Sequence, residues 1–139
     1  GYPTMDDELK MLFSHQVGSP VDQVTAIADG ASLLQIQDQI RGIAVQESVA
    51  RYLLKIVDLT RKHEDIEIGV SPRGAIAFFR AVQARVYLCD RRYVSPSDIQ
   101  ALALPILAHR IRLTAQARYS GATSESAIST ILSSVPVPT

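Results

Sequence analysis

One pattern occurs twice in this chain and limits its possible folds more than any other: a Ser-Pro pair followed by apolar residues at helical spacing. Residues 69–74 read GVSPRG and residues 93–98 read YVSPSD. A serine before the first turn can accept a hydrogen bond from an unpaired helix amide, and proline fits the first helical position because its φ angle is already helical. We therefore expect helices to begin at Ser71 and Ser95, with Asp98 reaching back in a capping box.

Apolar spacing of three and four residues extends the helical pattern over most of the chain. It predicts helices within residues 3–15, 29–43, 46–65, 71–90 and 123–135, and a further one after Ser95. The faces expected to be buried are Met5, Leu9, Leu12 and Phe13; Leu33, Ile36, Ile40 and Ile43; Val49, Tyr52, Leu53, Ile56 and Val57; Ala75, Phe78, Phe79, Val82, Val86 and Cys89; and Ile128, Ile131, Leu132 and Val135.

The helix after Ser95 contains Pro105, which removes one backbone hydrogen bond, so we expect a kink or an early end near Leu104. Residues 111–119 fit a short strand and an irregular connection equally well. The stretches GIAV and RIRL suggest a minor β-hairpin. The predicted fold class is all-α, a bundle of about five or six helices with room for that hairpin.

Composition excludes several functional classes. The 139 residues suit one domain. The 14 basic and 14 acidic side chains give a net charge of zero, which argues against a strongly basic surface for binding nucleic acid. No apolar run approaches the ~20 residues of a membrane span. One cysteine permits no internal disulfide and fits a reducing, cytoplasmic location. Because the chain begins GYPTMDDE, we expect it to be part of a longer protein.

Catalytic chemistry is not apparent in this sequence. It has no Gly-rich loop ending in Lys-Ser or Lys-Thr, and His15, His63 and His109 lack metal-ligand spacing. We therefore expect no catalytic residue, no metal site and no cofactor bound by this chain alone.

Arg73 is the one residue that does not suit its predicted place. A helix N-terminus carries partial positive charge, so an arginine there costs about 0.3–1 kcal/mol unless an anion lies nearby. The anion could be a carboxylate of Glu64, Asp65 or Glu67, or a ligand. Arg73 could also simply point into solvent.

The motifs in order give a more specific resemblance. The GVSPRG start, the RRYVSPSDI turn and the PILAHRI segment, in this order and spacing, resemble the C-terminal lid domain of MoxR-type AAA+ ATPases. The resemblance covers nearly all of residues 1–139 and implies one helical lid domain, with the ATPase core outside this chain.

That resemblance also implies a role for the start of the helix at residue 71. Arg73 would be the second-sensor arginine that reaches the γ-phosphate of ATP on the core, with Ser71 and Pro72 supporting the helix start. ATP and Mg would belong to the full-length parent. The expected partners are the parent's own core, neighbouring subunits of a hexameric ring, and a client protein whose identity the sequence does not indicate.

Two alternatives remain open from the sequence. One is the equivalent lid of a magnesium-chelatase-type ATPase. The other is an independent helical module that binds nucleic acid or protein through residues 94–112, where His109, Arg110 and Arg112 supply positive charge.

Overall fold

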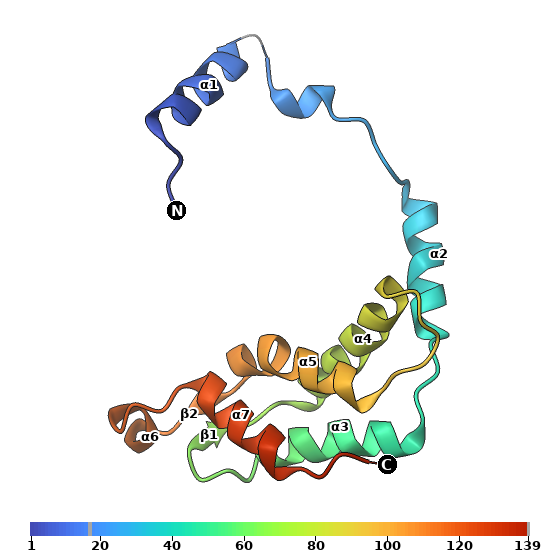
Figure 1. Ribbon diagram of the computed structural model, residues 1–139, viewed down its shortest axis with the longest axis vertical. Coiled ribbons are helices and arrows are strands. Elements are labelled where there is room, and N and C mark those ends of the chain that lie inside the picture. The colour runs from blue at the N-terminus through green and yellow to red at the C-terminus, as the bar shows by residue number, and fades with distance from the viewer. Residues whose placement is uncertain (17, 139) are drawn as a thin grey trace. The chain divides into compact units, whose positions relative to one another are not determined.

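A computed structural model describes residues 1–16 and 18–138 (Figure 1). The chain divides into two compact units, Gly1–Gln35 and Ile36–Thr139, which we describe separately. The described residues form seven α-helices: α1 Met5–Gln16, α2 Gly30–Arg41, α3 Glu47–Thr60, α4 Pro72–Leu88, α5 Pro96–Leu107, α6 Ala115–Tyr119 and α7 Ser124–Ser134. Short 3₁₀ turns occur at η1 Pro20–Gln23 and η2 Ala108–Arg110, and two strands at β1 Ile66–Ile68 and β2 Arg112–Leu113. The all-α class with a minor β element is confirmed, and α6 is the one α-helix among the described residues that the sequence pattern did not predict.

The first unit contains two predicted helix starts. Thr4 Oγ1 accepts a hydrogen bond from the Asp7 amide at 3.3 Å, and an Asp29 carboxylate oxygen accepts from the Ser32 amide at 2.7 Å. Asp29 is therefore the N-cap of α2. Within this chain no residue of α1 or α2 is buried, so the predictions that these helices bury their apolar faces are wrong for the chain by itself.

The second unit holds the hydrophobic core. Helix α5 packs against α4 and α7, and α3 packs against α4, α5 and α7. The largest fully buried side chains are Phe78, Ile56, Ile99, Leu107, Ile128 and Ile131. All five residues of the predicted α3 face are buried, together with Thr60.

The predicted face of α4 needs one correction at its end. Cys89 is exposed, because the helix stops at Leu88 and Cys89 occupies the C-cap position. The next residue, Asp90, has a φ of 53°, which turns the chain away from the helix axis. Phe79 is half-buried and packs against the edge of the core.

Of the two stretches predicted to form the β-hairpin, one is a strand of the observed sheet and the other is not. β2 lies in the predicted RIRL stretch and pairs antiparallel with β1, with Ile66 opposite Leu113. The GIAV stretch instead forms an isolated parallel bridge between Ala44 and Tyr93. It is held there by the buried Gln83 side chain, whose Nε2 donates to the Ile43 carbonyl at 3.0 Å.

Pro105 does not end α5, so the early end predicted near Leu104 is wrong. The helix continues to Leu107 and then tightens into η2. Proline removes only its own N–H bond, and Ala103 and Leu107 on either side of it are buried in the core. Packing of this last turn therefore compensates for the missing hydrogen bond.

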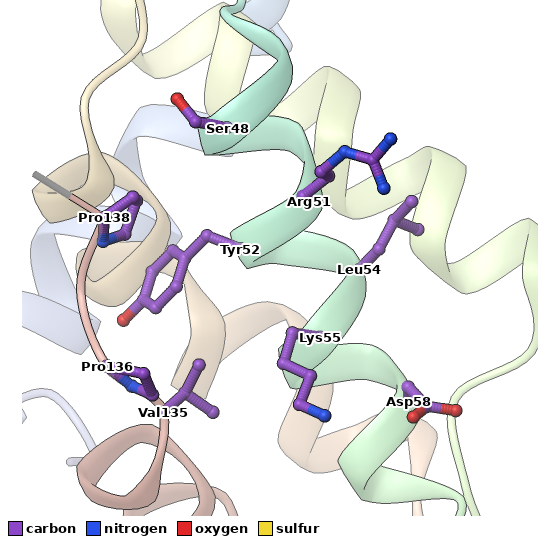
Figure 2. A pocket seen from close by; sticks show the side chains of 9 residues that line it. All are labelled: Ser48, Arg51, Tyr52, Leu54, Lys55, Asp58, Val135, Pro136 and Pro138. Carbon is purple, nitrogen blue, oxygen red and sulfur yellow. The ribbon is translucent and has the colours of Figure 1, made fainter.

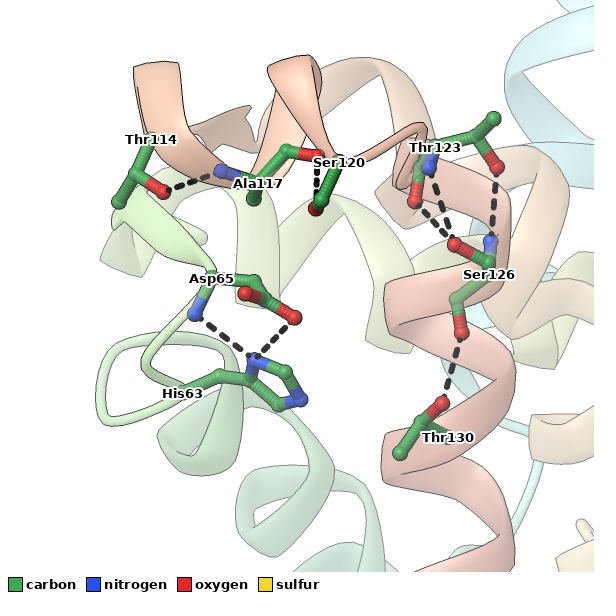
Figure 3. Close-up of polar contacts among 8 residues, drawn as sticks. All are labelled: His63, Asp65, Thr114, Ala117, Ser120, Thr123, Ser126 and Thr130. Atoms are coloured by element: carbon green, nitrogen blue, oxygen red, sulfur yellow. Dashed lines mark hydrogen bonds and ion pairs between the residues drawn. The ribbon is translucent and has the colours of Figure 1, made fainter.

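Short polar side chains define the last two helix starts (Figure 3). Thr114 Oγ1 accepts from the Ala117 amide at 3.2 Å, which begins α6. Thr123 and Ser126 exchange hydrogen bonds, Thr123 Oγ1 accepting from the Ser126 amide at 3.1 Å and Ser126 Oγ accepting from the Thr123 amide at 3.0 Å. This reciprocal pair begins α7, which lies within the predicted range 123–135.

Candidate functional site

The candidate site is the start of α4, and its geometry begins with the predicted cap. Ser71 Oγ accepts a hydrogen bond from the Gly74 amide at 3.1 Å, and Pro72 occupies the first helical turn. One of the unpaired amides at this helix end is therefore satisfied within the helix start itself.

The residue before the cap is anchored to the end of α3. The buried Val70 donates its N–H to Thr60 Oγ1 at 3.0 Å and accepts at its carbonyl from Arg61 Nε at 2.8 Å. Thr60 Oγ1 in turn donates to the Val57 carbonyl at 2.6 Å. These bonds hold the entry to α4 at a defined place on the core.

Two glycines allow the backbone at the start of α4 to lie this close to the end of α3 and to Val70. A Cβ on Gly69 would stand 2.6 Å from the Thr60 carbonyl oxygen, and one on Gly74 would stand 2.7 Å from Val70 Cγ1. Both distances are shorter than a carbon side chain tolerates, so a side chain at either position would displace its neighbours. In GVSPRG, each residue other than Arg73 thus has a structural task.

Arg73 has none of the carboxylate partners that the sequence offered. Its side chain is exposed, and within residues 1–16 and 18–138 it makes no ion pair and no hydrogen bond. Glu67 pairs instead with Arg112 at 3.0 Å, and the Asp65 carboxylate lies 3.9 Å from His63 Nδ1. The interpretation that Arg73 pairs with Glu64, Asp65 or Glu67 is therefore wrong.

Two further arginines lie beside the start of α4. Arg61 reaches the Val70 carbonyl, as described above, and Arg110 Cδ lies 3.4 Å from where a Cβ on Gly74 would be. Arg110 also donates to the Ile106 carbonyl at 2.7 Å, which satisfies a carbonyl at the end of α5, and it contacts the ring of His109. Sequence reasoning did not connect Arg61 and Arg110 with Arg73, because no local pattern brings these three residues together.

A contrasting charge site lies at the start of α5. The carboxylate of Asp98 is almost completely buried and forms a two-pronged ion pair with Arg91, with one bond of 3.0 Å. Asp98 also accepts from Ser95 N at 3.0 Å and from Ser95 Oγ at 2.7 Å, so it reaches back to the cap as predicted. The Arg91 hydrogen bonds hold the pKa of Asp98 well below its usual range and raise that of Arg91. This pair closes the turn between α4 and α5. Each of its charges is neutralised by the other, in contrast to the charge of Arg73.

Two surface grooves of the second unit lie away from the start of α4. A groove of about 540 Å³ runs between the outer face of α3 and the segment 135–138 (Figure 2). Tyr52, Lys55 and Pro136 are among the residues that line it. A second groove, of about 560 Å³, lies near Gln39, Tyr87 and Arg92. Arg73 lines neither groove.

Two absences concern residues 1–16 and 18–138 alone. In that part of the chain, no three His, Cys, Asp or Glu side chains come close enough together to hold a metal ion. Nor does it contain a helix with the length and apolar character needed to cross a membrane.

Comparison with known proteins identifies the fold that carries this site. The AAA lid domain family matches residues 58–131, from the end of α3 into α7. The chain belongs to the AAA lid domain family. The match includes Arg61, Arg73 and Arg110, so all three arginines beside the α4 start lie within the lid domain.

Relatives and a solved structure agree with this assignment. The chain is 35% identical over 99% of its length to "Uncharacterized protein YeaC" of Bacillus subtilis and 26% identical over 99% to "Chaperone MoxR1" of Mycobacterium tuberculosis. A 46-residue stretch is 46% identical to "Protein MoxR" of Paracoccus denitrificans. A crystal structure named "putative ATPase", from Cytophaga hutchinsonii, matches the whole chain with a TM-score of 0.82 and 29% identity. The chain is thus an AAA lid domain of the MoxR-like type.

The relatives are much longer than this chain. It spans 43% of the Bacillus protein, 38% of the Mycobacterium protein and 45% of the Cytophaga chain.

Proposed function

We propose that this chain is the C-terminal lid of a MoxR-type AAA+ ATPase, the parent, and that Arg73 is its second-sensor arginine. In this role Arg73 contacts the γ-phosphate of ATP held by the parent's ATPase core. The observation that carries the proposal is the exposed guanidinium of Arg73, without a partner among the described residues, at a helix start whose other residues are structurally committed.

The chemistry of the start of α4 suits a phosphate group. A guanidinium offers several N–H donors in a fixed plane that matches phosphate oxygens, and a charge-assisted hydrogen bond is among the stronger ones available. Arg61 and Arg110 add positive potential nearby, although each already has a carbonyl partner. ATP, with Mg bound by the core, would supply the missing negative charge.

This arrangement would act as a switch, with the chemistry performed by the core. Arg73 favours the state in which the γ-phosphate is present, and loss of that phosphate removes the contact and frees the lid to move. In a hexameric ring the movement would alter contacts between subunits. We propose that the parent uses this change in a chaperone-like role in the cytoplasm, assembling a client protein or inserting a cofactor.

The alternatives receive less support from the charges. Arg112, which a nucleic-acid-binding module would need, is paired with Glu67, and Arg110 bonds the end of α5. The Glu67 carboxylate neutralises the charge of Arg112, and the Ile106 carbonyl occupies one donor of Arg110, so fewer groups are available to a phosphate backbone. A magnesium-chelatase-type parent has the same lid requirements and is distinguished by the sequence of its core.

Substitution of Arg73 tests the sensor role. We expect Arg73→Ala to leave the stability of this chain unchanged or to raise it by up to about 1 kcal/mol, since a positive charge leaves a helix N-terminus. In the parent, the same change should lower ATP turnover, and Arg73→Lys should restore it only in part. Thermal melts of the chain and steady-state ATPase assays of the parent measure both effects.

Arg80→Ala is the matched control. Arg80 is exposed on α4, two turns beyond Arg73, and has no ion pair with a described residue. Its loss should leave turnover near normal. Normal turnover in Arg73→Ala, or an equal loss in Arg80→Ala, would refute the sensor role.

A further inference from the structure

One side of α1, in the first unit, presents four large apolar side chains to solvent. Met5, Leu9, Leu12 and Phe13 have exposed fractions of 82%, 51%, 71% and 60%. At about 100° per residue these four positions fall on one face about 100° wide. We define them as the α1 stripe.

The composition of α1 shows that the stripe is not an ordinary solvent face. Large apolar residues scattered singly on a surface are normal, whereas four on one helix face indicate a contact surface. Helical spacing places Asp6 along one edge of the stripe and Glu8 along the other. A partner surface should therefore be apolar at its centre and basic at its rim.

Helix length supports the same conclusion. Helices below about 12–15 residues are marginal in water without tertiary packing, and α1 has 12 residues. The Thr4 cap and the exposed Lys10–Asp7 pair at 3.6 Å contribute little by comparison with burial of an apolar face. A stable α1 thus needs a surface that covers its stripe.

The comparisons leave room for such a surface outside this chain. The AAA lid family match begins at residue 58, so α1 lies outside it. The Cytophaga structure matches the whole of this chain, α1 included, yet the match takes up only 45% of that longer chain. We infer that the α1 stripe docks on an apolar, basic-rimmed surface of the parent's ATPase core. This inference rests on the proposed function, because it requires a parent with such a core.

A photocrosslinking experiment in the full-length parent identifies the occupant. Phe13 is replaced by benzoylphenylalanine, the protein is irradiated without nucleotide, and the crosslinked peptides are sequenced by mass spectrometry. We expect the crosslinks to fall in the ATPase core. Crosslinks to another copy of α1 or to residues 36–138 would overturn the inference. So would a result in which the probe reacts only with solvent and no peptide is crosslinked.

Amide exchange in the same parent provides a second readout. We expect α1 amides to exchange at least about tenfold faster when Leu9→Asp and Leu12→Asp are combined, since docking protects them. Ser14→Asp, on the opposite side of the helix, is the control and should leave exchange unchanged. Protected amides in α4 and α5 verify that each variant remains folded. Fast α1 exchange in the unmodified parent, or no change in the double variant, would also overturn the inference.

Arg73→Ala separates this inference from the sensor role. Without nucleotide, that substitution should not alter α1 exchange or the crosslinks. The docking inference and the sensor proposal can therefore be refuted independently of each other.

Discussion

At the scale of single residues, two arginines show how the surroundings decide what a charge does. Arg91 faces the nearly buried carboxylate of Asp98 and fixes the turn into α5. Arg73 stands exposed without a carboxylate among the described residues, although three acidic residues lie just before it in the sequence. The first charge is used within the fold, and the second remains available to a ligand.

The Asp98–Arg91 pair should dominate the acid sensitivity of the fold. Because the folded-state pKa of Asp98 is depressed, the unfolded chain binds its proton first as the pH falls. Stability is therefore present in full above the ordinary aspartate pKa of about 4 and declines below it. Urea denaturation at pH 7, 4 and 3 measures this decline, which should be smaller in Arg91→Ala.

Removing Arg91 should also destabilise the fold at neutral pH. We expect Arg91→Ala to lower the free energy of unfolding by clearly more than the loss of an exposed pair does, because the nearly buried Asp98 carboxylate keeps only its Ser95 bonds and Arg85 at 3.6 Å. Arg51→Ala is the control, since its pair with Glu47 is 76% and 77% exposed, and such pairs contribute about 0.3–0.5 kcal/mol. Equal losses in the two variants would contradict our account of the buried pair.

At the scale of elements, the helices differ in how much they depend on their surroundings. α4 has a serine cap, a proline in its first turn and a face of buried residues, so local and tertiary terms agree. α1 has a cap but no buried residue. Its sequence pattern predicts a helix correctly, whereas its stability requires a partner surface.

The Ser71 cap allows a direct test at this scale. Ser71→Ala should lower the free energy of unfolding by about 0.5–2 kcal/mol, because the Gly74 amide loses its acceptor. Ser129→Ala serves as the control, since that exposed serine bonds only the Glu125 carbonyl within α7 and alanine is the better helix former. Unchanged denaturation midpoints for Ser71→Ala would mean that the cap does not stabilise α4.

At the scale of the whole molecule, the proposal assigns nucleotide chemistry to the core and sensing to the lid. The 139-residue chain contains no phosphate-binding loop, and its proposed contact with ATP is one arginine. One charge-assisted hydrogen bond contributes about 1.5–3 kcal/mol, less than the ~4 kcal/mol of a millimolar complex.

We therefore expect this chain alone to bind ATP more weakly than about 1 mM and to show no turnover. Calorimetric titration with ATP and a phosphate-release assay measure the two quantities. Micromolar binding by the isolated chain would show that the lid carries a nucleotide site of its own.

The sequence by itself determined the positions of every described α-helix except α6, the Ser-Pro starts, the buried face of α3 and the family resemblance. These features depend on residues within about four positions of one another, where spacing and capping act directly. It also identified Arg73 as the residue that its own helix did not explain.

Only the tertiary structure decided what surrounds these local features. It paired β1 with β2 across two helices, matched Glu67 to Arg112, placed Arg110 beside Gly74, and left Cys89 and the α1 stripe exposed. The physical reason is that contacts between residues distant in the chain depend on how the helices pack, and a periodic pattern specifies which face is apolar without specifying what covers it.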